Sequence, residues 1–120
     1  MPASVETMHA GDSHVVVRLR GELSIDGVRT VELKFTASTA SRRTHAIVDM
    51  SEVTFLASLG MGMLLLQVAR ALASGKHRIV LVAPQDAVAT ALRTAKLESL
   101  MPIAADLSAA RAVLGVNAPA

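Results

Sequence analysis

The sequence predicts an α/β domain with a mostly parallel sheet of four to five strands, an N-terminal hairpin and about four helices. Three short runs rich in apolar residues, 14–19, 46–50 and 79–83, have the length and composition of strands. The last two resemble the buried strands of a parallel sheet, which are apolar on both faces. A helical pattern follows each run, and this alternation of strands and helices is typical of α/β domains.

The N-terminal part should supply the hairpin at one edge of the sheet. Residues 2–12 read as a weak strand or a tail, and residues 14–19 form a strand around three consecutive valines. Gly21 is expected to end this second strand, since glycine commonly interrupts strands.

Ser24 stands where the first helix should begin. A serine hydroxyl can accept a hydrogen bond from a free amide of the first helical turn, and Asp26 adds a favourable negative charge there. The helix is expected over residues 25–40, and the polar residues 38–44 connect it to the strand at 46–50.

The second helix is predicted over residues 58–73. One face repeats at intervals of three and four and should pack on the sheet; it consists of Met61, Leu64, Leu65, Val68 and Leu72. Leu59, Met63 and Leu66 form a second apolar stripe. This stripe is either part of a crowded core or an exposed surface that docks a partner.

The C-terminal part continues the alternation. Gly75 ends the second helix, and residues 79–83 form the third central strand. A helix over 87–95, a short edge strand over 101–104 and a last helix from Asp106 or Ser108 to Leu114 should follow.

Composition suits one ordinary domain over residues 1–120, with its core over about 14–114. Hydrophobic residues make up 52% and charged residues 18%, and no uncharged apolar run is long enough to span a bilayer. We expect a protein without a secretory leader, and zero cysteines fit a reducing, cytoplasmic compartment. With 2% aromatics, a net charge of +2 and no clustered Lys/Arg face, nucleic acid is not an expected partner.

Nothing in the sequence points to catalysis, a metal or a cofactor. The four histidines are scattered and form no ligand pair. There is neither a Gly-x-Ser-x-Gly elbow nor a phosphate-binding Gly-x-x-x-x-Gly-Lys loop. We therefore expect a protein that is not an enzyme.

Ser58, directly before the second helical pattern, has two interpretations. It can be a capping serine, or a phosphoacceptor whose phosphate the free amides and the dipole of the helix would favour. The residues of the helix start do not decide between them.

Residues 49–61, Asp-Met-Ser-Glu-Val-Thr-Phe-Leu-Ala-Ser-Leu-Gly-Met, resemble the signature of STAS domains, the anti-sigma-factor antagonist family. In that signature an apolar strand leads through a Asp-Leu-Ser-x-Val-x-Phe turn into an Asp-Ser-x-Gly helix start. Residues 20–23, Arg-Gly-Glu-Leu, resemble the Gly-Glu-Leu-Asp segment of the family, and residues 79–83 and 87–92 resemble its later strand and helix.

The resemblance implies partner switching. A STAS antagonist binds an anti-sigma factor with a histidine-kinase-like ATP-binding fold, which phosphorylates a serine of the antagonist; a serine phosphatase reverses this. Ser58 matches that serine, so we expect it at or within one residue of a helix N-terminus and open to solvent. The expected partner-binding residues surround it: Ser24, Phe55, Leu56, Ala57, Leu59, Gly60, Met63 and Leu66.

Two departures leave an alternative open. Ala57 and Ser24 stand where the family usually has aspartate, next to the phosphoacceptor and after Gly-Glu-Leu. The alternative is a STAS interaction module that is not phosphorylated, serving as a scaffold or as a subunit that binds the ATPase of a lipid-transport complex.

Overall fold

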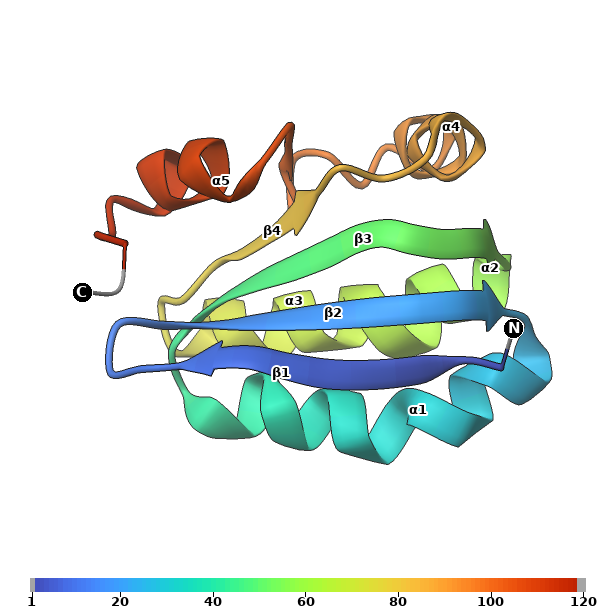
Figure 1. Cartoon of the computed structure of the whole chain (residues 1–120), viewed down its shortest axis with the longest axis horizontal. Coiled ribbons are helices and arrows are strands. Elements are labelled where there is room, and N and C mark those ends of the chain that lie inside the picture. The colour runs from blue at the N-terminus through green and yellow to red at the C-terminus, as the bar shows by residue number, and fades with distance from the viewer. Residues whose placement is uncertain (1, 119–120) are drawn as a thin grey trace.

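Five strands form one sheet in the order in which they occur along the chain, β1-β2-β3-β4-β5 (Figure 1). The computed structural model describes residues 2–118. The strands are β1 (Ser4–Ala10), β2 (His14–Leu23), β3 (His45–Leu56), β4 (Ile79–Val82) and β5 (Ile103–Ala104). β1 pairs with β2 in an antiparallel hairpin, and every other neighbouring pair is parallel. The predicted fold class is confirmed.

β2 runs further than its sequence indicated. Gly21 was expected to end the strand, but β2 continues to Leu23, and Gly21 lies inside it with a φ of 87°. The pairing of β2 with β3 shifts register directly after Gly21, which marks a β-bulge. Glycine adopts this φ without strain, so the strand bends there and goes on.

β3 is also longer than predicted. The expected strand over 46–50 extends to Leu56, so the segment expected to be a turn is strand. The family signature implied a turn here, but Val53 and Leu56 are buried and pair with the far end of β2. Long-range pairing therefore extends the strand directly to the start of the second helix.

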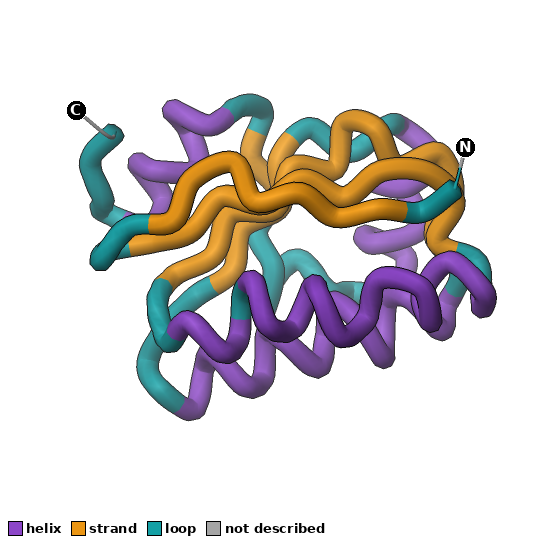
Figure 2. The backbone as a smooth tube through the Cα atoms, turned by 60° about the horizontal axis from the view of Figure 1, so that its bottom comes forward, coloured by secondary structure: helices purple, strands orange, loops and turns teal. Residues whose placement is uncertain are grey.

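The helices are α1 (Ile25–Ser38), a short 3₁₀ turn η1 (Ala40–Arg42), α2 (Ser58–Gly60), η2 (Met61–Leu66), α3 (Gln67–Ser74), α4 (Asp86–Thr94) and α5 (Leu107–Leu114). α2, η2 and α3 follow one another without a break, and η2 is a π-helical segment. α1 and this second helix lie together on one face of the sheet (Figure 2). Ser24 caps α1, since its hydroxyl accepts a hydrogen bond from the Gly27 amide at 3.3 Å.

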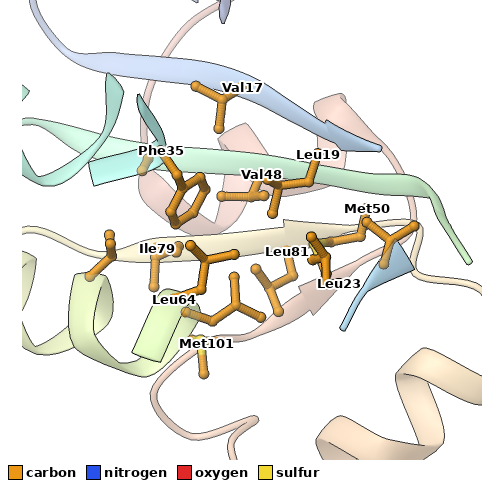
Figure 3. Close-up of a cluster of buried hydrophobic side chains, with 14 of the residues drawn as sticks. Val17, Leu19, Leu23, Phe35, Val48, Met50, Leu64, Ile79, Leu81 and Met101 are labelled. Atoms are coloured by element: carbon orange, nitrogen blue, oxygen red, sulfur yellow. The ribbon is translucent and has the colours of Figure 1, made fainter. Parts of the chain in front are cut away.

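The main core lies between the sheet and these helices. Phe35 of α1 and Leu64 of the second helix meet the strand residues Leu19, Val48 and Leu81 there (Figure 3). All of the predicted sheet-facing residues of the second helix are buried except Met61, which is half-buried against the same core. The periodicity of this helix therefore predicted its buried face correctly.

The opposite face of the sheet carries α5 over a smaller apolar cluster that includes Ile47, Val80 and Ala110. Beyond α5 the face is polar. The Arg18 guanidinium donates to Asp49 at 2.9 Å and the Arg20 guanidinium donates to Glu52 at 2.8 Å. Burial would raise the pKa of Asp49, but hydrogen bonds from Ser51 and the charge of Arg18 lower it.

His14 makes stability depend on pH, and this gives a first prediction. Its side chain is 1% exposed, with Nε2 at 3.3 Å from the Arg111 Nε donor. Burial, and then the positive charges of Arg111, His9 and His45, lower its pKa below 6.5. The folded protein therefore binds fewer protons than the unfolded chain, and stability falls as the pH drops below about 6.5.

The loss of unfolding free energy due to His14 should reach at most about 1.4 kcal/mol per pH unit. His14→Gln should flatten this slope between about pH 7 and pH 5, measured by urea unfolding at each pH. The comparison concerns the slope, so any loss of packing that shifts all values equally does not affect it. An unchanged slope would show that His14 does not titrate between the two states.

Candidate functional site

Ser58 is the first residue of the helix that follows the central strand β3. The helix N-cap is Ala57, with extended backbone angles, and the Ser58 side chain is exposed. The expectation of an exposed serine at a helix N-terminus is confirmed. Figure 1 shows that α2 and α1 begin at the same end of the sheet.

The interpretation of Ser58 as a capping serine is wrong. Ala57 occupies the cap position, and no side chain accepts a hydrogen bond from the first turn. The Met61 amide, at 3.1 Å from the Ala57 carbonyl oxygen, is the first to join the helical ladder. The three preceding amides, of Ser58, Leu59 and Gly60, have no helical partner, so the helix start favours negative charge.

The starts of α1 and α2 are held against each other. The Ala57 amide donates to the Leu23 carbonyl oxygen at 3.0 Å, which joins the ends of β3 and β2. Gly60 is buried, and a Cβ atom there would lie 3.1 Å from Val28 of α1. The two N-caps, Ser24 and Ala57, directly follow these joined strand ends. These are the two positions at which the family usually has aspartate.

The expected partner-binding residues differ in exposure. Phe55 and Met63 are 52% and 43% exposed. Ser24, Ala57, Leu59 and Leu66 are half-buried, whereas Leu56 and Gly60 are buried. Leu56 and Gly60 therefore support the site from inside the protein, since their atoms are covered by the protein itself.

The second apolar stripe, Leu59, Met63 and Leu66, is partly core and partly exposed surface. Leu66 packs partly against the main core, and Leu59 is half-buried, so these two are not an open surface. Met63 projects into solvent, and Gly62 beside it has open space around its α-carbon. The accessible part of the stripe is therefore its middle, on the π-helical segment; such segments occur often at functional sites.

The structure adds residues that the sequence did not single out. Phe55 and α4 line a hollow of about 180 Å³, to which Ala87 and Ala91 contribute. Ile25, the first residue of α1, is 53% exposed. A second hollow, of about 240 Å³, contains Ser24 together with Glu22 and Asp26. Helix α4 follows β3 by about thirty residues in the chain, so only the fold brings it to Phe55.

The neighbouring hydroxyls have other surroundings. The Ser51 amide donates to Asp49 Oδ1 at 2.9 Å, and the Ser51 carbonyl oxygen accepts from Gln85 at 3.1 Å. Thr54 is exposed on β3.

Over residues 2–118 no group of three acidic or histidine side chains could hold a metal ion. No helix in that range combines the length and the apolar character that crossing a membrane requires.

A family model described as "Mlab, STAS domain" matches residues 7–102, which is more than half of the chain. The chain belongs to the STAS family. No curated protein matches the sequence at a significant level. The resemblance carried by residues 49–61 is thereby confirmed at the level of the family.

Solved structures of anti-sigma-factor antagonists share the fold of this STAS domain. One is a STAS domain protein from Planctomyces limnophilus, with a TM-score of 0.79, 13% identity and coverage of 92% of this chain and 97% of the other. Unphosphorylated SpoIIAA has a TM-score of 0.72, 23% identity and coverage of 96% and 100%. Phosphorylated SpoIIAA, a cell fate determinant of Bacillus, has a TM-score of 0.68, 22% identity and coverage of 92% and 99%.

Proposed function

We propose that this STAS domain is a cytoplasmic anti-sigma-factor antagonist that binds an anti-sigma factor and is controlled by phosphorylation of Ser58. The observation that carries the proposal is the position of Ser58. It is exposed at the first position of the helix, beside amides without helical partners. The solved structure of phosphorylated SpoIIAA, a protein of the same fold, supports it. Antagonists of the STAS family are in general regulators rather than enzymes.

The surroundings of Ser58 suit a switch. A phosphate brings about −1.5 to −2 charges and three acceptor oxygens, which the free helix start tolerates. Phe55, Met63 and Ile25 expose apolar surface at or near this end of the sheet. A partner that covers this surface would remove water from the phosphate, and an uncompensated charge at an interface costs several kcal/mol. Phosphorylation should therefore separate the two proteins.

The proposed partner is an anti-sigma factor with a histidine-kinase-like ATP-binding fold that is also the serine kinase. A serine phosphatase would restore the unphosphorylated form. We expect the partner to contact the hollow between Phe55 and α4 and the residues around Ser58 that are not buried. These residues are Ser24, Phe55, Ala57, Leu59, Met63 and Leu66. Small apolar side chains in that hollow suit an apolar side chain of the partner.

A second candidate is an interaction module without phosphorylation, either a scaffold or the subunit that binds the ATPase of a lipid-transport complex. The observation that favours it is the pair of N-caps. Ser24 and Ala57 lie at the two adjoining helix starts, and neither has a carboxylate that could orient the Ser58 hydroxyl. The match to a model described as "Mlab, STAS domain" is consistent with this candidate.

Phosphate transfer distinguishes the two candidates and is the second prediction. The protein is incubated with ATP and each histidine-kinase-like ATP-binding protein from the same organism, and its intact mass is then measured. We expect one added phosphate with the cognate kinase, and none in Ser58→Ala. Thr54→Ala, which removes the exposed hydroxyl four residues away, should still gain the phosphate.

Binding without any added mass would favour the module and contradict the switch. A phosphate gained by Ser58→Ala would show that another residue is the acceptor. Because no backbone amide donates a capping hydrogen bond to the Ser58 hydroxyl, Ser58→Ala should change the unfolding free energy by less than about 0.5 kcal/mol.

A further inference from the structure

The end of the sheet opposite Ser58 is strongly basic. Two turns meet there: the turn from α1 through η1 into β3, and the turn from α3 into β4 (Figure 1). The basic edge consists of Arg42 and Arg43 from the first turn and Lys76 and Arg78 from the second. Residues 33–48 and 67–85 contain no aspartate or glutamate.

Direct contacts hold the two turns together. The Ala46 amide donates to the Arg78 carbonyl oxygen at 2.9 Å, and the Arg78 amide donates to His45 Nδ1 at 3.0 Å. The rings of His45 and His77 meet edge to face, with centroids 5.4 Å apart. The sequence did not group these basic residues, because they come from two separate turns that only the parallel sheet brings together.

The cations of the basic edge have no carboxylate partner in residues 2–118. Arg18, Arg20 and Arg93 each pair with a carboxylate, but over residues 2–118 none of the four basic-edge side chains forms a salt bridge. Arg78 donates one hydrogen bond, from Nη1 to the Val113 carbonyl oxygen. Asp12, in the β1–β2 turn, lines a separate hollow together with Gly115 and Val116, which follow α5.

Basic residues often follow helices because they interact with the exposed carbonyl groups of the last turn. Here other donors satisfy those groups. At the end of α3, the Leu72 carbonyl oxygen accepts from the Gly75 and His77 amides, and the Ala73 carbonyl oxygen accepts from the Lys76 amide. At the end of α1, the Thr39 hydroxyl donates to the Phe35 carbonyl oxygen at 2.7 Å.

The positive charge of the basic edge also exceeds the negative charge of the helix ends beside it. The C-terminal ends of two helices together represent about one negative charge, whereas the basic edge carries four permanent positive charges. Arg43 and Lys76 in addition have left-handed backbone conformations, with φ of 55° and 64°, which glycine adopts at lower cost. An excess of unpaired cations at a small, open end of the molecule favours an anionic ligand.

A hollow of about 410 Å³ lies between the two turns. Ala40 and Arg43 line it from the first turn, and Leu72, Ser74 and His77 line it from α3 and the second turn. Its size is within the range of small-molecule sites, and its mixture of apolar residues with a few polar or charged groups is typical of them. Neither turn exposes a large apolar side chain, so insertion into a membrane interior is not indicated.

We propose that this hollow binds a phosphate-bearing small molecule or lipid headgroup, with Arg43 and His77, which line it, beside the phosphate and Lys76, next to His77 in the chain, attracting it. Guanidinium groups match the geometry of phosphate oxygens, and the surrounding cations raise the local concentration of anions. The site lies at the opposite end of the sheet from Ser58 and does not depend on the proposed switch.

The test is a titration of the ¹⁵N-labelled protein with sodium pyrophosphate, followed by amide chemical shifts. We expect saturable shifts in residues 40–45 and 72–78, which weaken as salt is added. The double variant Arg43→Gln/Lys76→Gln should bind at least tenfold more weakly. The matched control Arg29→Gln/Arg93→Gln removes the same charge from two exposed positions and should bind as the unchanged protein does.

A parallel sedimentation with vesicles of 70:30 phosphatidylcholine and phosphatidylglycerol identifies the source of the phosphate. Saturable pyrophosphate binding at the hollow supports a free phosphorylated molecule. Vesicle binding that the Arg43/Lys76 variant loses and the control keeps supports a lipid headgroup. The absence of both, or equal losses in the two double variants, would overturn the proposal. Both variants change exposed side chains, so their thermal unfolding should match that of the unchanged protein.

Discussion

Ser58→Glu should weaken the complex with the anti-sigma factor by about 100-fold or more. In the free protein the added carboxylate lies at a helix start, where the dipole favours it by about 0.3–1 kcal/mol. In the complex it would meet apolar or like-charged surface, at a cost on the order of several kcal/mol. Each ~1.4 kcal/mol corresponds to a factor of ten in the dissociation constant. Glutamate carries less charge than phosphate, so the effect of phosphorylation should be larger.

Two controls separate this effect from loss of structure. Ser58→Ala should keep most of the affinity, because the proposed interface is apolar and Ser58 makes no capping hydrogen bond. Ser108→Glu places the same charge in the first turn of α5, which covers the other face of the sheet. It should bind as the unchanged protein does. Isothermal titration calorimetry against one partner measures all four proteins, and equal affinities for Ser58→Ala and Ser58→Glu would refute control by charge.

Gly27→Ala should be the most damaging of the small substitutions. A Cβ atom at Gly27, in the first turn of α1, would lie 2.0 Å from the Glu22 carbonyl oxygen. That oxygen belongs to the backbone of β2 and cannot turn away as a side chain does. We expect a loss of about 3 kcal/mol of unfolding free energy, the upper part of the usual range for overpacking.

Gly62→Ala is the matched comparison on the second helix. Apart from its chain neighbours and the backbone of its own helix, no atom lies within 4 Å of the position of a Cβ atom there, and the residue is exposed. Alanine should stabilise the helix by about 0.5–1 kcal/mol, because it loses less backbone freedom on folding than glycine does. Urea unfolding of both variants gives the two values. A Gly27→Ala protein as stable as the parent would show that β2 and α1 can separate at this point without cost.

Residue patterns within single segments correctly predicted features that depend on neighbouring residues, such as helices, their buried faces and a helix cap. The periodicity of residues 58–73 gave both the helix and its buried face, with Leu64, Leu65 and Val68 in the core. Ser24 caps α1 as its position before that helix indicated. Ser58 was correctly expected at a helix start, and of its two interpretations only the capping one was wrong. Whether it is the cap or the first helical residue depends on the extended backbone of Ala57, which no residue pattern specifies.

Errors occurred where distant segments decide the outcome. The family signature implied a turn after Asp49, yet residues 51–55 continue β3 because β2 continues beside them past Gly21. Leu66 was grouped with Met63 in one stripe, and its partial burial follows from packing that the helix wheel does not contain.

The sequence by itself determined the STAS family, the α/β alternation and the serine at the start of the second helix, since each depends on neighbouring residues and their spacing. The tertiary structure decided which sites those residues form. It joined the ends of β2 and β3 so that Ser24 lies close to Ala57, and it brought α4 beside Phe55. It also brought Arg43 and His77 to one hollow at the opposite end of the sheet. These sites depend on pairing between strands far apart in the chain, and that pairing is set by the whole core.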